Sequence, residues 1–251
     1  MNILAIDTSM QACSVAVLQK KAKGQVCLSA CYEERARGHA ERLMGMIDEV
    51  LTKADMTIRQ VDQFAVCRGP GTFTGVRIGI ATARGLALAC ARPLRGIGTL
   101  EVLAARVVHE QAEQTEQAEQ VNPGQSVLER HLGIAVDARR GEIYWQLFDQ
   151  NGQAQSEPLA QNPQITAELI QHQRHPLHLA GSGAELIAEH LKPDTGDFSF
   201  SHPQLQPDAA RLATLVANTP DVGNQPAQSA SPLYLRPADA KTQSGYAIER
   251  Q

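Results

Sequence analysis

One pattern that occurs twice along the chain restricts its fold more than any other feature. Residues 3–18 read as an apolar strand, an aspartate, a polar turn and a returning apolar strand, and residues 132–148 repeat that order. A strand, a glycine loop and a helix then occur at 61–90 and again at 177–191. The repeat predicts a duplicated α/β fold with a cleft between its halves; the alternative is a chance likeness between two α/β units.

The chain has 251 residues, enough for one large domain or two small ones. A segment rich in Glu, Gln and Ala separates the two copies of the pattern and ends in Asn-Pro-Gly, so we place the domain boundary there. The predicted units are an N-terminal lobe (1–108), a polar linker or helix extension (109–126), a C-terminal lobe (127–240) and a loose tail (241–251).

Hydrophobic periodicity predicts the elements of the first half. Short apolar runs bounded by turn residues are typical of strands, whereas apolar residues three and four apart are typical of helices. Strands are expected at 3–6, 14–18, 26–32 and 61–67, and helices at 38–54, at 76–90 and from about residue 99.

Composition narrows the class of protein. The apolar share of 43% is ordinary for a soluble globular chain, and the net charge of -4 gives no global basic field that would attract nucleic acid. The five cysteines form no pair of CxxC motifs, which favours free thiols in a reducing cytoplasm. The start lacks the features of a signal peptide and no apolar run has the length of a membrane span, so we expect neither.

The first candidate site is the turn Asp7-Thr8-Ser9. An aspartate at the end of a buried strand, followed by hydroxyl groups, can hold a hydrated cation or phosphate oxygens. The alternative is an Asx turn that only closes the hairpin, and the chemistry alone favours it.

The second candidate site is the loop RGPGTFTG, residues 68–75. Backbone N–H groups of a glycine loop that opens a helix can bind an anion. The loop is not a Walker motif, because no Gly-Lys-Ser/Thr follows, and its G-x-G-x-x-x-G spacing is not that of the dinucleotide motif. The alternative is a chain reversal that needs positive φ at Gly71 or Gly75. Both interpretations stay open.

Small residues on the following helix indicate a close approach by another backbone. Gly75, Gly79, Ala83 and Ala87 recur at four-residue spacing, and a glycine inside a helix costs roughly 1 kcal/mol relative to alanine. The approaching backbone is either a partner's helix or this protein's own sheet. On the preceding helix, Met46 lies outside the main apolar stripe, and methionine is common on adaptable contact surfaces.

No catalytic or metal-binding constellation is found in the sequence. The eight histidines are scattered, none forms H-E-x-x-H, and no Ser/His/Asp arrangement has a predictable geometry. We therefore predict no catalytic residues, no metal and no cofactor.

Three segments together resemble the bacterial TsaB family, also called YeaZ. They are ILAIDTS at 3–9, GPGTFTGVRIGIATARGLA at 69–87 and YLR at 234–236. The resemblance implies a two-lobed fold of the actin/Hsp70/sugar-kinase type, a duplicated RNase H-like fold. It also implies a role in making threonylcarbamoyladenosine in tRNA, with a catalytic paralogue, TsaD, and an ATPase, TsaE, as partners.

The resemblance also sets this chain apart from its catalytic paralogue. TsaD proteins carry N-H-x-x-G-H after the equivalent helix, and its two histidines hold a metal. The matching segment here is GTLEVL, which places Thr99 and Leu103 at the histidine positions. Neither side chain replaces an imidazole ligand. The resemblance thus implies a non-catalytic scaffold that retains Asp7, Thr8 and the glycine loop (Gly71, Gly75) as a vestigial anion site.

The alternative function is a nucleotide-binding ATPase of the actin-like fold that uses Asp7, Thr8 and the glycine loop. As a scaffold, the chain is expected to pair with TsaD through helices 38–54 and 76–90, to form a homodimer when alone, and to meet tRNA only through the complex. It is expected in the cytoplasm, without contact to membrane or DNA. The predicted partner-facing residues are His39, Leu43, Met46, Gly75, Gly79 and Ala83.

Overall fold

The computed structural model describes residues 1–21, 24–121, 130–173, 175–192, 196–219 and 230–236. The first half contains β1 (Asn2–Asp7), β2 (Ala12–Lys20), β3 (Val26–Glu34), α1 (His39–Lys53), the short 3-10 helix η2 (Ile58–Gln60), β4 (Gln63–Cys67), α2 (Phe73–Cys90), β5 (Leu94–Ile97) and α3 (Thr99–Val121). The second half contains β6 (His131–Asp137), β7 (Ile143–Phe148), β8 (Leu159–Gln161), α4 (Pro163–Ile170), β9 (Leu177–Ala180), α5 (Ala184–Ala188), β10 (Phe198–Ser201) and α6 (Ala209–Asn218).

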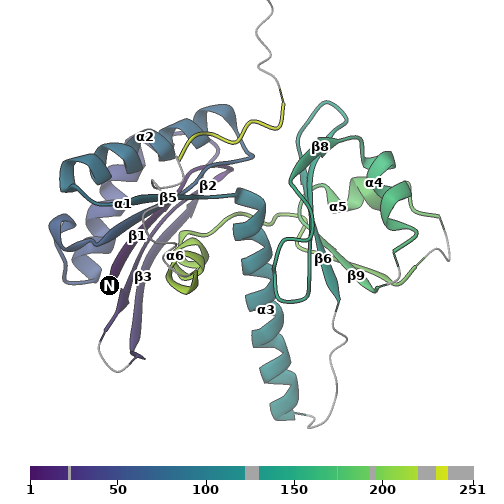
Figure 1. The fold of residues 1–251 in the computed structure, drawn as a ribbon, viewed down its shortest axis with the longest axis horizontal. Helices are drawn as coiled ribbons and strands as arrows, with labels where there is room; N and C mark the ends of the chain where they lie inside the picture. The colour runs from purple at the N-terminus through teal and green to yellow at the C-terminus, as the bar shows by residue number, and fades with distance from the viewer. Residues whose placement is uncertain (22–23, 122–129, 174, 193–195, 220–229, 237–251) are drawn as a thin grey trace, which may run out of the picture.

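The two halves have the same topology. The first sheet has the strand order β3-β2-β1-β4-β5, and the second has the order β8-β7-β6-β9-β10. In each sheet the first three strands in sequence pair antiparallel, and the last two join in parallel. Each half is therefore one βββαβαβα unit. The predicted fold class, a duplicated two-lobed α/β fold, is confirmed (Figure 1).

Burial along the strands follows from their places in the sheet. The central strands β1 and β4 are buried almost throughout, because helices cover both faces of the sheet. The edge strand β3 instead alternates between exposed and half-buried residues. Helix α2 begins at Phe73, three residues earlier than the sequence predicts, because the Thr72 side chain caps it by accepting a hydrogen bond from Gly75 N at 3.2 Å.

Helices cover each sheet from two sides, and the last helix of each half covers the other half's sheet. In the first lobe, α1 and α2 pack on one face and α6 packs on the other. In the second lobe, α4 and α5 pack on one face and α3 packs on the other. Figure 1 shows α6 beside the strands of the first lobe and α3 between the two lobes. The segment assigned to the C-terminal lobe from sequence thus contributes a core helix to the first lobe.

Helix α2 is also long and apolar enough, by length and composition alone, to cross a membrane. In the fold α2 packs against the sheet of the first lobe: its stripe of small and branched residues lies on β1 and β4. Helix α3 continues through residues 109–121, so this part of the predicted linker is helical. The predicted tail (241–251) lies outside the described residues.

Candidate functional site

The turn after β1 holds its aspartate in local hydrogen bonds. Asp7 Oδ1 accepts from Ser9 N at 3.2 Å and from Ser9 Oγ at 2.7 Å, which is the Asx turn that the sequence left as an alternative. Asp7, Thr8 and Ser9 are all buried. Among the described residues, Asp7 Oδ2 has no hydrogen-bond partner. The carboxylate is therefore closed off from solvent.

Burial controls the acidity of this carboxyl. Desolvation raises the pKa of Asp7 above its ordinary value of 3.8, and the hydrogen bonds from Ser9 oppose the shift by less. Burial and the neighbouring Asp7 likewise raise the pKa of Cys67 well above its usual range. In both groups burial disfavours the charged form, as expected for a buried structural turn.

The glycine loop packs directly on this turn. A Cβ at Gly71 would lie 2.2 Å from Ser9 O, and a Cβ at Gly75 would lie 2.1 Å from Thr8 O. Thr72 N donates to Ser9 O at 2.8 Å, and Thr8 Oγ1 donates to Gly75 O at 2.7 Å. The two candidate sites thus form one packed unit, in which Thr72 N, Gly75 O and the space beside Gly71 and Gly75 are used by the protein itself.

The structure corrects the reason for these glycines. One of the two interpretations of the loop was a chain reversal that needs positive φ at Gly71 or Gly75. The loop glycine with positive φ is instead Gly69, with φ of 100°. Gly71 and Gly75 are required by close backbone approach instead, since no side chain fits against the turn.

The row of small residues on α2 faces inward, which corrects the prediction that it faces a partner. A Cβ at Gly79 would lie 2.7 Å from Thr8 Oγ1 and 3.4 Å from Val66 Cγ2, and Ala83 is buried in the core beneath the helix. The close approach inferred from the spacing is real. The approaching backbone is this protein's own β1 and its turn.

Helix α1 requires the same correction. Leu43 and Met46 are buried in the core of the first lobe, with Met46 0% exposed, so neither is available to a partner. His39 is half-buried at the start of the helix. Met44, by contrast, is 54% exposed.

The outward row of α2 lies opposite the buried one. Ala81, Gly85 and Ala89 are exposed, and Leu88 beside them is 84% exposed. A Cβ at Gly85 meets no atom of the described residues within 4 Å. The same four-residue spacing that singled out the inner row could have found this outer row, but the spacing alone does not say which row faces the sheet.

The two positions that the resemblance sets against the metal-binding histidines of TsaD, Thr99 and Leu103, are also closed. Thr99 is buried, and its Oγ1 donates to Ser9 Oγ at 3.2 Å. Leu103 is buried in the core that joins α3 to the second sheet. A leucine offers no donor atom, and the threonine hydroxyl is occupied, so these residues do not fit a metal ion.

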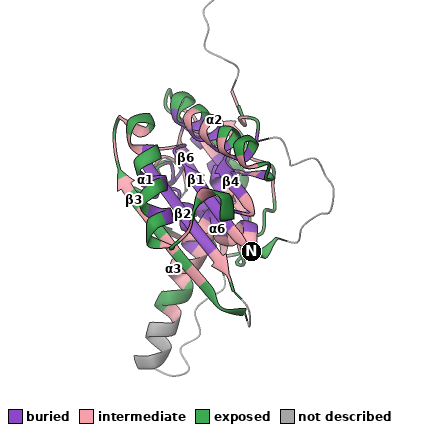
Figure 2. Ribbon diagram, turned by 90° about the vertical axis from the view of Figure 1, so that its left-hand side faces the viewer, coloured by how far each residue is buried: buried purple, intermediate pink, exposed green. Residues whose placement is uncertain are grey.

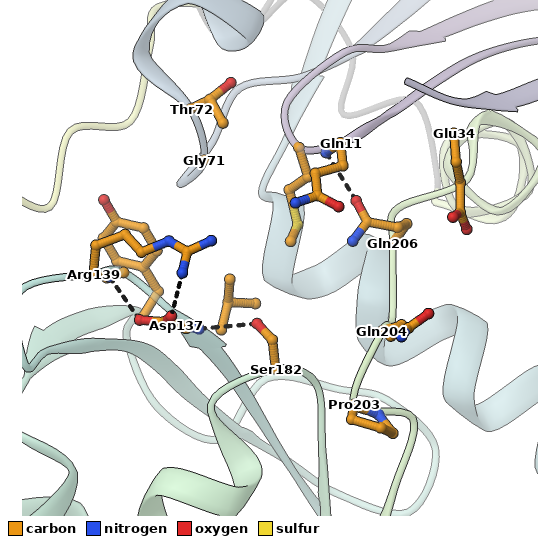
Figure 3. Close-up of a pocket in the computed structure, with 14 residues that line it drawn as sticks. Gln11, Glu34, Gly71, Thr72, Asp137, Arg139, Ser182, Pro203, Gln204 and Gln206 are labelled. Carbon is orange, nitrogen blue, oxygen red and sulfur yellow. Dashed lines mark hydrogen bonds and ion pairs between the residues drawn. The ribbon is translucent and has the colours of Figure 1, made fainter. Parts of the chain in front are cut away.

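A cavity of about 520 Å³ lies between the lobes. Figure 3 shows Gly71 and Thr72 on its first-lobe side and Asp137, Arg139 and Ser182 on its second-lobe side. Asp137 is the counterpart of Asp7 in the repeat, and it too closes an Asx turn, accepting from Arg139 N at 2.7 Å. Its other oxygen pairs with the Arg139 guanidinium at 3.2 Å. The carboxylate of Asp137 on the cavity wall thus already has partners within its own lobe.

Comparison with known proteins identifies relatives along nearly the whole chain. The family described as TsaD, tRNA N6-adenosine threonylcarbamoyltransferase, matches residues 32–224. The tRNA threonylcarbamoyladenosine biosynthesis protein TsaB of Escherichia coli (strain K12) is 32% identical over 94% of this chain and 95% of its own. The TsaB protein of Bacillus subtilis (strain 168) is 26% identical over 86% of each.

Solved structures agree with these relatives. A structure titled "YeaZ from Pseudomonas aeruginosa" has a TM-score of 0.74 and 31% identity, over 93% of this chain and 99% of that one. A second Pseudomonas aeruginosa structure, described as an uncharacterized protein with similarity to peptidase YEAZ, has a TM-score of 0.75 and 32% identity, over 94% and 99%. On this identity, coverage and shared topology, the chain belongs to the TsaB (YeaZ) family.

Proposed function

We propose that this protein is a non-catalytic subunit of the bacterial tRNA threonylcarbamoyladenosine synthesis machinery. Its relatives are named for that pathway, and the matching family is that of the threonylcarbamoyltransferase TsaD. In this proposal the chain pairs with a TsaD-type enzyme, works beside a TsaE-type ATPase, and meets tRNA only through the complex. Its place is the cytoplasm.

The observation that carries the proposal is the closed site behind the glycine loop. The loop packs on the Asp7 turn, Thr99 hydrogen-bonds to Ser9, and Leu103 lies in the core. A group-transfer enzyme needs an open position where substrate meets its catalytic groups. Here the space between the loop, the Asp7 turn and Thr99 is filled by the protein's own backbone and side chains, which supports a scaffold rather than an enzyme.

The outer face of α1 and α2 supports pairing with a related fold. Figure 2 shows exposed residues along both helices on the side away from the sheet. The flat, small-residue surface at Ala81 and Gly85 admits a facing helix closely, and Met44 and Leu88 supply apolar contacts at its edges. We define these four residues as the outer patch.

Charge on this face also favours pairing. Residues 63–100 contain five arginines and no acidic residue, and Arg77 and Arg84 of α2 are exposed. The exposed side of α1 instead carries Glu41 and Asp48, and Glu49 there is already paired with Arg42 of the same helix. A two-fold pair that sets α1 against a partner's α2 would bring opposite charges together, so the chain is expected to form a homodimer when alone.

Reconstitution with purified components tests the proposal. The protein alone, given tRNA and a threonylcarbamoyl donor, should transfer no threonylcarbamoyl group, whereas adding the TsaD-type enzyme and the TsaE-type ATPase of the same organism should give transfer that depends on this protein. Robust transfer by the protein alone would overturn the scaffold proposal. Calorimetric titration with ATP, with and without Mg²⁺, tests the alternative ATPase function, which predicts saturable binding between the lobes.

A further inference from the structure

We infer that residues 230–236 form a latch that fastens the two lobes together across the mouth of the cleft. Figure 1 shows this segment, in yellow, running past α2 toward the second lobe. It follows α6 in the sequence and lies apart from the elements that connect the lobes through their cores. We call it the latch.

The latch is anchored on the first lobe by both backbone and side chains. Ala230 is buried in the first-lobe core, with its Cα 3.2 Å from the position of a Cβ at Gly96. Leu233 N donates to Arg68 O at 2.7 Å, which continues the hydrogen bonding at the end of β4. This end of the latch is therefore part of the folded lobe.

An aromatic and arginine stack holds the middle of the latch to α2. The Tyr234 hydroxyl accepts from Arg77 Nε at 2.8 Å, and the Tyr234 ring stacks on Phe73 with centroids 6.0 Å apart. The Arg77 guanidinium lies over the Phe73 ring at 3.5 Å. Three exposed side chains thus support one another at the start of α2, next to the wall of the cleft.

Arg236 carries the latch to the second lobe. It forms an ion pair with Glu142, and its Nη2 donates to Arg139 O at 2.8 Å. Its guanidinium also lies 5.6 Å from the centre of the Tyr144 ring. Arg139 and Tyr144 both line the cavity between the lobes, so the latch is fixed to the wall of that cavity.

The second-lobe attachment is a turn under backbone strain. Arg139, Arg140 and Gly141 have φ of 64°, 60° and 76°, and non-glycine residues rarely adopt this conformation. Arg236 binds the turn at two points, on Arg139 O and on the Glu142 carboxylate, which favours the strained form. The consequence is a fixed separation of the lobes: opening the cleft requires the Arg236 contacts to break first.

Hydrogen exchange of the full chain tests the latch. Arg236→Ala should speed exchange of amides 138–142 by about tenfold, because it removes a partly exposed ion pair, a hydrogen bond and a cation–π contact. Tyr234→Ala, which touches only the first-lobe end, should speed exchange of the same distant amides. Small-angle scattering should show a larger radius of gyration for both variants.

Arg130→Ala is the matched control, because Arg130 makes an ion pair and a carbonyl hydrogen bond with Asp197 within the second lobe. It should leave amides 138–142 and the radius of gyration unchanged. Exchanging the charges, Arg236→Glu with Glu142→Arg, should restore slow exchange relative to Arg236→Glu alone. If Tyr234→Ala leaves amides 138–142 within twofold of the parent, or if Arg130→Ala matches Arg236→Ala, the segment is not a latch.

Discussion

Gly75 and Gly85 lie on the same helix and have opposite surroundings. A Cβ at Gly75 would be 2.1 Å from the backbone oxygen of Thr8, whereas a Cβ at Gly85 meets nothing within 4 Å among the described residues. The cost of replacing each glycine is thus decided by what faces it. The helix itself has the same preference for alanine at both positions.

We predict that Gly75→Ala destabilises the protein and Gly85→Ala does not. At Gly75 the added methyl group must displace the turn after β1, which should cost roughly 1–3 kcal/mol of unfolding free energy. At Gly85 the higher helix propensity of alanine should add roughly 0.5–1 kcal/mol. Urea unfolding of the two variants measures both effects, and equal changes of either sign would contradict the packing described here.

Asp7 should make stability depend on pH in a specific direction. Its pKa in the folded state is raised by burial, so the folded protein keeps a proton that the unfolded chain releases above the ordinary value of 3.8. The stability that the neutral carboxyl provides is complete below that value and is lost as pH rises toward the raised pKa.

We predict that Asp7→Asn gains stability relative to the parent as pH rises. The amide cannot ionise, so the difference in unfolding free energy between variant and parent should grow in favour of the variant as pH rises above the ordinary pKa of 3.8 toward the raised pKa of the folded state. Urea unfolding at several pH values within this range gives the difference directly. A difference that stays constant with pH would show that Asp7 is not desolvated in solution.

At the scale of elements, α2 has one face in the core and one in solvent. Its inner row packs on β1 and β4, and its outer face forms the outer patch together with Met44 of α1. Because the inner row contains the closest backbone approaches, substitutions there change folding. Those on the outer patch test the proposed pairing without disturbing the core.

We predict that Leu88→Glu on the outer patch weakens self-association by at least about tenfold, since burying one leucine at an interface contributes roughly 1.5–3 kcal/mol. The melting temperature of the dilute monomer should stay close to that of the parent, because Leu88 is 84% exposed. Light scattering over a concentration series measures association. Leu169→Glu on α4, where the leucine is 59% exposed, is the control and should leave association intact. A dimer that survives Leu88→Glu would show that the interface does not include Leu88.

At the scale of the whole molecule, the lobes share helices across their boundary. Helix α6 supplies Ala209, Leu212, Ala213 and Val216 to the core of the first sheet, and α3 supplies Leu100, Leu103 and Val107 to the core of the second. Each lobe therefore completes its core with a helix from the other half.

We predict that residues 1–108, the N-terminal lobe as the sequence divides it, do not fold alone. Without α6, the face of the first sheet that carries Ile3, Ala5 and Leu18 is left open to water. The fragment should lack a cooperative thermal transition and should bind a hydrophobic dye, and a fragment extended to residue 219 should recover the transition. Cooperative melting of residues 1–108 alone would show that α6 is dispensable.

The sequence by itself determined the order of elements and the repeat. Alternating apolar runs, turn residues and helical spacing predict most of the strands and helices of the first half to within a few residues. They do so because turn chemistry and side-chain periodicity depend on residues that are close together in the chain. The sequence also placed Thr99 and Leu103 where histidines would be needed. That inference rests on the resemblance to the family together with the identity of the two residues.

The tertiary structure decided everything that depends on which surfaces meet. Two rows of small residues share α2 at the same spacing, and only the position of β1 shows that Gly79 faces inward and Gly85 outward. The exchange of α3 and α6 between the lobes, and the meeting of Arg77 with Tyr234, join residues far apart in sequence. No local pattern encodes such contacts, because they arise only when the two sheets and their covering helices pack together.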